Sequence, residues 1–520
     1  MLQAKDIDVL TLTATQAEEL LDSKQLTSAA LVEAYLAQIE KHNHNGLHLN
    51  SLISITPKDI LLNTARRLDQ ERETGHKRGP LHGIPFIVKD VFVTDQSLSM
   101  PTTCGAAAFA TSMGKRNAPL IQHLLDQGMI LLGKANLTEF CGLKFKGMTP
   151  GWSTVGGQTQ NPYVFGGLEE NEKLIGHSSA GGSSSGSAAG VAAGFAPLAI
   201  GTECCGSLIT PANRAGMYAL KCSLGSVNAV GCFGYTDCLD CIGGMAKSAR
   251  DLATFTAALL QRDEPFDLSG GMEGMRVAFT DVKVWRLPED FCGWPGDTRE
   301  QLVGVIQGWP RYETMIADIT QEAGYASIQD MIKAHGAEIE TDIDLSNAPT
   351  LFQSDEGKSY FYEIAFYQLC NKYFPTFFDE LAESKVHSLA ELVEWNKKHS
   401  PKQDELEDLL ANTRKPEDID KYINDMRERG RCGLDRHFER NDIVVALADS
   451  PLVQYSATTG YPIACLPLGT VKYSETNERP YGICMIAGKG REDILLRFMA
   501  ACESLLPPRP VPKPLLQGRA

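Results

Sequence analysis

The sequence contains no run of about 18 apolar residues, which is the length that a membrane-spanning helix needs. The nearest candidate, the apolar stretch 188–200, is shorter than that and is rich in alanine and glycine. The N-terminal residues are mixed and polar, unlike a secretory signal peptide, and no common sorting or lipidation signal stands at the C-terminus. We therefore expect no membrane span and a cytoplasmic protein.

An excess of positive charge is also lacking. Lys and Arg number 49 against 65 Asp and Glu, so the formal net charge is −16. An acidic surface repels nucleic acid, and we expect no nucleic-acid partner. The sequence has no phosphate-binding GxxxxGK[ST] motif, and its 11 histidines form no HExxH or similar pair. We therefore predict neither a metal nor a cofactor.

Cysteine, by contrast, is plentiful. A chain of 520 residues can bury a core without disulfide bonds, so we interpret its 14 cysteines as reduced, as in an intracellular protein. Cys238 and Cys241 form a CxxC motif with Cys222 and Cys232 nearby, and a zinc site is the alternative. A single CxxC is a weak signal, so structural cysteines are the preferred interpretation.

The chain divides into segments that differ in composition and hydrophobic pattern. Residues 1–75 are predicted to be helical, and three helix starts are indicated by a capping box at Thr15 and Glu18, by Thr27 or Ser28, and by Pro57. Short apolar segments such as 83–91 and 129–133 then alternate with helical ones over 76–262 and again over 443–506. This alternation predicts one α/β domain whose sheet is covered on both faces. Charged helical stretches dominate 263–442, which we interpret as a helical insertion.

A lysine stands in the apolar segment HGIPFIVKD, residues 82–90. Burying a charged lysine costs free energy, and the ordinary interpretation is a side chain that reaches solvent or pairs with Asp90. Neighbours on a strand point to opposite faces, however, so Asp90 points away from Lys89. A buried lysine can be neutral and then serve as a base.

Two further segments carry serines among small residues. The run SSAGGSSSGSAAGVAAG (178–194) resembles a flexible linker or a phosphate-binding loop, but it passes directly into a segment that is typical of a packed helix. The run GTECCGS (201–207) ends on Ser207. A serine on such a tight loop can present its hydroxyl beside backbone N–H groups, which are what an oxyanion hole requires.

Together these segments resemble the amidase signature family, which carries a lysine in a VKD-type segment, a Gly/Ser loop and a GxS-type nucleophile. Ser183 and Ser207 stand 24 positions apart, as in the family pattern. Further similar segments span nearly the whole chain: GKANLTEF, GWSTVGGQTQNPY, GYPIACLPLG and RPYGICMIAG. GSSSGSA, GTE and SLAELVEWNKKH are similar to the peptide-amidase-like branch.

The resemblance implies an amidohydrolase that cuts a C–N amide bond of a small-molecule or peptide amide through an acyl-enzyme, without a cofactor. Ser207 is then the nucleophile, Ser183 relays its proton and Lys89 is the base. The implied fold is a large twisted mixed sheet with helices on both faces, and the insertion at 263–442 shapes the substrate pocket. We expect a monomer or a homodimer.

The resemblance also assigns supporting roles around the two serines. Backbone N–H groups near Cys204, Cys205 and Gly206 form the oxyanion hole and bind substrate, and Gly182 and Ser184 support the loop of the relay serine. The family has a cis peptide bond before that serine, here Gly182–Ser183.

Three departures from the family pattern lead to separate expectations. Cys205 replaces a glycine or aspartate, and a backbone that needs positive φ there would be strained by a cysteine. Ile209 replaces an arginine, so we expect Glu203 to pair with Arg214 instead. Cysteine is the better nucleophile, so Cys204 or Cys205 is an alternative to Ser207.

Alternative functions use the same residues. Acyl transfer or ring closure would proceed through the same acyl-enzyme. An amidotransferase subunit shares the core pattern, but its usual GTDTGGSIR is missing here. A catalytically inactive amidase fold that serves as a binding protein is the third alternative.

Overall fold

The computed structural model describes residues 1–143, 148–170, 172, 176–281, 311–343, 345, 350–355, 357–399, 406–472, 474 and 476–516, and for 311–320 it describes the backbone alone. The insertion predicted for 263–442 is therefore described in part, and 282–310 lie outside the described residues.

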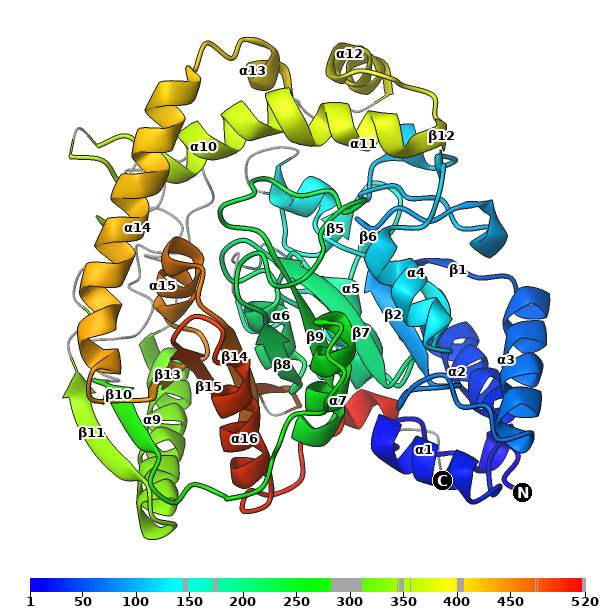
Figure 1. Cartoon of the computed structure of the whole chain (residues 1–520), viewed down its shortest axis with the longest axis horizontal. Coiled ribbons are helices and arrows are strands. Elements are labelled where there is room, and N and C mark those ends of the chain that lie inside the picture. Colours follow the sequence, from blue (N-terminus) through cyan, green and yellow to red (C-terminus); the bar gives the residue numbers. More distant parts are fainter. Residues whose placement is uncertain are drawn as a thin grey trace.

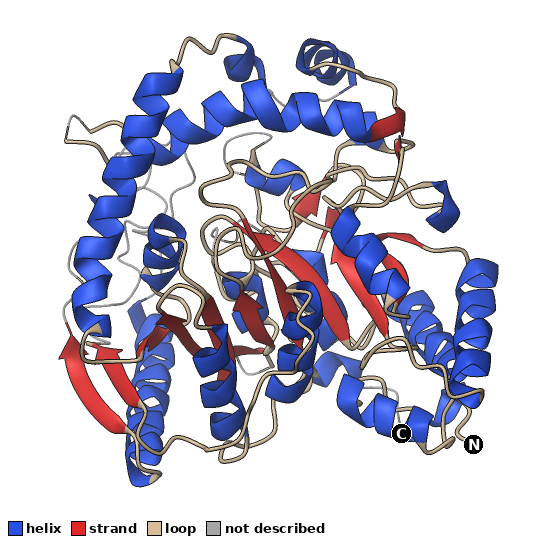
Figure 2. Cartoon of the chain, in the orientation of Figure 1, coloured by secondary structure: helices blue, strands red, loops and turns tan. Residues whose placement is uncertain are grey.

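One mixed sheet runs through the middle of the molecule, with helices around it (Figure 2). Its eleven described strands lie in the order β1 (Leu52–Ile55), β4 (Ile130–Ala135), β2 (Pro85–Lys89), β7 (Leu198–Glu203), β9 (Cys241–Ala246), β8 (Tyr218–Lys221), β14 (Ile463–Lys472), β15 (Glu478–Ala487), β13 (Ile443–Leu447), β10 (Arg276–Thr280) and β11 (Glu338–Ile343). The trios β4–β2–β7 and β13–β10–β11 are parallel, and the other neighbours are antiparallel. The predicted large mixed α/β sheet is thus confirmed.

The described helices are α1 (Ala14–Asp22), α2 (Ser28–His42), α3 (Lys58–Glu73), α4 (Pro119–Asp126), α5 (Ser185–Ala192), α6 (Ile209–Arg214), α7 (Ala249–Leu259), α9 (Arg311–Ala334), α10 (Tyr360–Gln368), α11 (Phe374–Glu380), α12 (Leu389–His399), α13 (Leu406–Leu410), α14 (Pro416–Phe438), α15 (Leu452–Thr459) and α16 (Glu492–Glu503). Among the helices of this described part, none has the length and apolar character that crossing a membrane requires. Small two-stranded sheets pair β3 (Met113–Gly114) with β12 (Leu381–Glu383) and β5 (Trp152–Ser153) with β6 (Gly157–Gln158).

Consecutive residues of β2 point to opposite faces of the sheet, and each face is covered by a helix. Phe86 packs against Phe255 of α7, with ring centroids 6.5 Å apart. Ile87 faces α5, where a Cβ on Gly190 would lie 2.7 Å from Cδ1 of Ile87. Both faces of the strand are therefore buried, which explains why β2 is apolar along its length instead of alternating.

The first helix begins two residues earlier than its predicted capping box. Thr13 and Gln16 form the box, so the prediction of Thr15 and Glu18 is wrong. The N–H and hydroxyl groups of Thr15 bind instead to the carboxylate of Asp251, at 2.8 and 2.7 Å. A carboxylate from α7 thus binds the first turn of α1 and ties the N-terminal helices to the sheet layer.

The second and third helices begin where the sequence predicts. The hydroxyl of Thr27 accepts the N–H of Ala30 at the start of α2. Pro57 precedes α3, which ends at Glu73.

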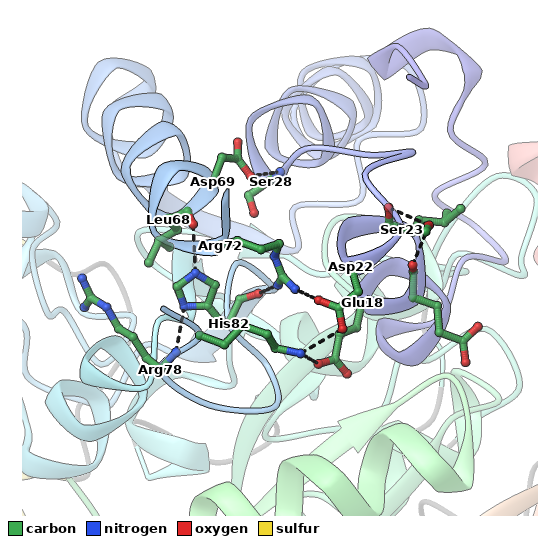
Figure 3. Close-up of polar contacts among 12 residues, drawn as sticks. Glu18, Asp22, Ser23, Ser28, Leu68, Asp69, Arg72, Arg78 and His82 are labelled. Carbon is green, nitrogen blue, oxygen red and sulfur yellow. Dashed lines mark hydrogen bonds and ion pairs between the residues drawn. The ribbon is translucent and has the colours of Figure 1, made fainter. Parts of the chain in front are cut away.

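A polar network fixes the loop that leads into β2 onto these helices (Figure 3). The guanidinium of Arg72 on α3 pairs with Asp22 of α1 and donates to the carbonyl of His82. Nε2 of His82 donates to the carbonyl of Leu68 at 2.9 Å, and its Nδ1 accepts the N–H of Arg78 at 3.3 Å. Burial lowers the pKa of His82, in agreement with a neutral ring that donates once and accepts once. These contacts fix the position of the loop that precedes β2, the strand that carries Lys89.

A second buried contact to the N-terminal segment should make stability depend on pH. The ammonium of Lys247 donates to the carbonyls of Val9 and Leu12, and burial lowers its pKa from 10.5 to about 7, with Arg509 adding repulsion. Between these two values the unfolded chain binds more protons than the folded chain, so stability rises with pH from about 7 to about 10. Lys247→Met removes this dependence. Thermal melts from pH 7 to 9.5 should therefore show the melting temperature of the wild type rising relative to that of the variant, whereas a constant difference would contradict it.

The segment predicted as a helical insertion contains more than helices. Two of its strands, β10 and β11, extend the main sheet in parallel with β13. Helices α10 and α11, joined by the π-helical turn η6 (Leu369–Tyr373), and the long helix α14 form an arch beside and above the sheet (Figure 1). Phe374 and Phe377 of the arch are buried against Phe233, with ring centroids 5.2 and 5.5 Å apart. These aromatic side chains thus pack the arch against the rest of the molecule.

Candidate active site

Lys89, the last residue of β2, is completely buried. Its Nζ lies 2.7 Å from Oγ of Ser183 and 2.9 Å from Oγ1 of Thr202 on the neighbouring strand β7. Within the described part of the chain, no carboxylate forms an ion pair with Lys89. The lysine therefore lies between two hydroxyls without a counter-ion, which is the setting that a lysine base requires.

Asp90 pairs with a different lysine, in agreement with the predicted alternation of side chains along the strand. Its carboxylate lies 3.4 Å from Nζ of Lys134 on β4, and it accepts the N–H of Thr103 at 3.1 Å as well as the Thr103 hydroxyl. Burial raises the pKa of Asp90, and Lys134 opposes that effect. The ordinary interpretation, in which Lys89 pairs with Asp90, is wrong because the two side chains lie on opposite faces of β2.

The loop before α5 holds Ser183 against Lys89. The Gly182–Ser183 peptide bond is cis, as the resemblance implies, and the carbonyl of Ser183 accepts the N–H of Thr138. Gly182 has no room for a side chain, because a Cβ would lie 2.5 Å from Oγ1 of Thr138 and 3.1 Å from Pro150. Glycine is therefore required at this position by close packing.

Ser184 links the relay loop to both neighbouring segments. Its N–H donates to the carbonyl of Ser207 at 2.9 Å. Its hydroxyl donates to the carbonyl of Thr202 at 3.1 Å and accepts the N–H of that residue at 3.3 Å. Ser184 thus joins the Gly/Ser loop, strand β7 and the loop of Ser207.

The loop 204–207 follows β7 and leads into α6. Gly206 has φ +84°, a conformation that favours glycine, whereas Cys205 does not have a positive φ. The condition for strain at Cys205 is therefore not met, because the left-handed residue is the next one along the chain. In the described structure, the N–H groups of Cys205, Gly206 and Ser207 donate to no acceptor, so three consecutive donors are available to a ligand.

Ser207 is linked to the loop of Ser183 through the backbone, but in the described structure no side-chain hydrogen bond joins it to Ser183 or Lys89, the other members of the predicted triad. Lys89 and Ser183 are fully buried, whereas Ser207 is half-buried. The link between the two serine segments is the backbone contact from Ser184 to the Ser207 carbonyl.

Glu203 and Arg214 do not pair as expected. One carboxylate oxygen of Glu203 accepts the N–H groups of Leu208 and Ile209, both at 2.8 Å, at the start of α6. Arg214 donates to the carbonyl of Gly176 at 2.7 Å and lies 3.7 Å from the carboxylate of Asp449. The expected pair is wrong, because backbone N–H groups, rather than an arginine, bind the Glu203 carboxylate through one of its oxygens.

The cysteines near the site are neutral thiols. Burial raises the pKa of Cys205 to about 12 and that of Cys204 well above its ordinary value. A thiol is a good nucleophile only as the thiolate, so these values argue against the cysteine alternative. Among the described residues, none of the cysteines of the CxxC region belongs to a group of three potential ligand atoms close enough to hold a metal ion.

A cavity of about 320 Å³ lies beside this constellation. Thr202, the partner of Lys89, lines it together with Val93, and the rest of the wall comes from residues within 223–242 and from η6 and α11 of the arch. The sequence did not single out Thr202 or Asp240, which also line this cavity. The one available signal for Thr202 was a hydroxyl in a buried strand of the GTE motif.

The chain is similar to known proteins that are named as amidases. A model of the amidase family matches residues 30–271. A curated relative from Schizosaccharomyces pombe, named as an amidase, is 27% identical over 99% of this chain and 88% of its own length. The crystal structure of an amidase family protein from Bacillus anthracis has a TM-score of 0.80 at 26% identity, covering 97% of this chain and 93% of that one.

A structure of peptide amidase from Stenotrophomonas maltophilia is similar to the same extent. Its TM-score is 0.79 at 25% identity, and the match covers 97% of this chain and 99% of that one. The match to the amidase family model includes the segments that carry Lys89, Ser183 and Ser207, and the chain has the fold of amidase signature structures over nearly its whole length.

Proposed function

We propose that this chain hydrolyses the C–N bond of a small-molecule or peptide amide with Ser207 as nucleophile, Ser183 as relay and Lys89 as base. The observation that carries the proposal is the buried 2.7 Å contact between Nζ of Lys89 and Oγ of Ser183, at a lysine whose described hydrogen-bond partners are hydroxyls and which forms no ion pair with a described carboxylate. An isolated structural lysine would be expected to pair with an acid, as Lys134 does with Asp90.

In the first half of the reaction, neutral Lys89 accepts the proton of Ser183. Ser183 takes the proton of Ser207 as the Ser207 oxygen attacks the amide carbon. The N–H groups of Cys205 and Gly206, together with that of Ser207, donate to the oxyanion that develops on the carbonyl. Ser183 then returns a proton to the departing amine or ammonia, and the acyl group remains on Ser207.

In the second half, water replaces the amine. The same relay removes a proton from water as it attacks the acyl-enzyme, and the carboxylic acid leaves. The scheme requires the Ser207 hydroxyl to come within hydrogen-bond distance of Ser183 when substrate is bound. No cofactor takes part in this scheme. A cytoplasmic location and a monomeric or homodimeric state remain predictions from the sequence.

Ammonia release from a panel of primary amides tests the proposal. Hydrolysis predicts equal amounts of ammonia and acid. Added amine or hydroxylamine distinguishes acyl transfer, because a transferase would convert most of the acyl-enzyme to the new amide even at low amine concentration. If folded protein released ammonia from none of a broad panel and bound none of the amides, the proposal would be wrong and the inactive binding protein would be favoured.

A further inference from the structure

The cavity beside the candidate triad has an apolar wall that also carries charged groups. Phe233, Phe377 and Tyr373 supply aromatic surface, and Val227 and Ile242 supply aliphatic surface. A volume of about 320 Å³ accommodates a small aromatic or branched acyl group. The charged residues of the wall are then what would select among such groups.

Two of the carboxylates that line the cavity already have cationic partners. Asp237 is exposed and lies 2.9 Å from the ammonium of Lys372, which also lines the cavity. Glu380 lies 3.0 Å from the guanidinium of Arg116. Neither carboxylate is left for a charged ligand without breaking an existing ion pair.

The third carboxylate, Asp240, differs from these. It is half-buried in the cavity wall, and in the described structure it forms no ion pair. Oδ2 accepts the N–H groups of Tyr235 and Thr236, at 2.7 and 2.6 Å, while no donor from the described residues reaches Oδ1. The carboxylate is therefore oriented by the loop 234–240 but keeps one oxygen for a ligand.

Asp240 also stands next to the aromatic wall. A Cβ on Gly234 would lie 3.3 Å from both the Asp240 carboxylate and the ring of Tyr373, so the acid and the ring border the same small space. Burial raises the pKa of Asp240 to about 6, the hydrogen bonds from the N–H groups of Thr236 and Tyr235 limit this rise, and the group is mostly ionised at neutral pH. An unpaired anion beside aromatic faces is a favourable site for a cation.

We propose that Asp240 is a specificity residue and that the cavity takes amides whose acyl group carries a protonated amine beside an apolar or aromatic body. The ammonium would donate to Oδ1 of Asp240 while the apolar body lies against Phe233, Phe377 and Tyr373. The net charge of −16 on the chain attracts such substrates over longer distances. This inference rests on the proposed function for the chemistry but concerns binding alone.

Binding to the Ser207→Ala variant tests the inference apart from catalysis. Two primary amides of matched shape, 4-(aminomethyl)benzamide and 4-methylbenzamide, differ in the ammonium group. Titration calorimetry at pH 7.5 should give at least tenfold tighter binding of the cationic amide. Adding Asp240→Asn keeps an acceptor for the Tyr235 and Thr236 N–H groups and should reduce the preference to threefold or less. The matched control, Asp237→Asn, should leave the preference within threefold of its starting value.

Each other outcome contradicts the inference. If the Ser207→Ala protein prefers the cationic amide by less than threefold, the inference is overturned before Asp240 is changed. It is also overturned if a tenfold preference for the cationic amide remains in a folded protein that carries Asp240→Asn. Failure of both amides to bind also overturns it. Ammonia release from 4-methylbenzamide by the wild type is measured separately. It tests the proposed hydrolysis whether or not the cavity prefers a cation.

Discussion

Ser207→Ala is expected to lower kcat for amide hydrolysis by about 10⁴-fold or more, because the acyl-enzyme cannot form without its oxygen nucleophile. The fold should survive, since the Ser207 side chain is half-buried and forms no hydrogen bond with other described residues. Ammonia release under saturating amide measures the loss, and thermal melting measures the stability.

The matched control for this change is Ser504→Ala, which removes an exposed hydroxyl that donates to the carbonyl of Ala501 on the last helix. It should keep full activity. If Ser207→Ala retained more than a few per cent of the wild-type rate, the nucleophile would be another residue, and Cys205 would be the next candidate.

Lys89→Met is expected to lower kcat by about 10³-fold or more while leaving the melting temperature nearly unchanged. Methionine fills similar space in the buried strand but cannot accept a proton. No carboxylate loses its partner, because the described contacts of Lys89 Nζ are the hydroxyls of Ser183 and Thr202. The loss should persist at every pH at which the protein is folded.

Lys134→Met provides the contrast to this prediction. It would leave the buried carboxylate of Asp90 without its ammonium, which costs about 3–5 kcal/mol in comparable buried pairs. We expect a lowered melting temperature and, below it, much of the wild-type activity. An active Lys89→Met protein, or one that unfolds as Lys134→Met does, would contradict the assignment of Lys89 as base.

Much of the fold follows from local pattern because its strands are buried on both faces. The apolar segments 83–91 and 129–133 became β2 and β4 for this reason. Strand β11 (Glu338–Ile343) was not predicted. It lies at the edge of the sheet, where most of its residues are half-exposed or exposed, and its charged composition is similar to that of the neighbouring helices. A strand of this kind is recognised by its pairing with β10, which the sequence does not show.

The capping box of α1 illustrates a different limit. Thr13 with Gln16 and Thr15 with Glu18 both fit the motif, and they are two residues apart. The contact that distinguishes them comes from Asp251, 236 positions away from Thr15. A local motif predicts that a helix begins here, but a distant contact decides at which residue.

In the candidate site, the direction of side chains was predictable and their partners were not. Because side chains alternate along a strand, Lys89 and Asp90 were predicted to point to opposite faces, and in the structure they contact different partners. Glu203 was expected to find an arginine, yet it binds backbone N–H groups whose availability depends on where α6 begins. The pairing of β7 with β2 brings Thr202 next to Lys89. The pairing of β7 with β9 brings Asp240, which directly precedes β9, to the cavity.

The attachment site of a fluorophosphonate tests the central claim most directly, because this reagent bonds covalently to an activated serine. Tandem mass spectrometry of the labelled, digested protein should place the phosphonate on Ser207. Labelling should be absent in Ser207→Ala and strongly reduced in Lys89→Met. A phosphonate on a different residue, or undiminished labelling of folded Ser207→Ala, would contradict the Ser207–Ser183–Lys89 account.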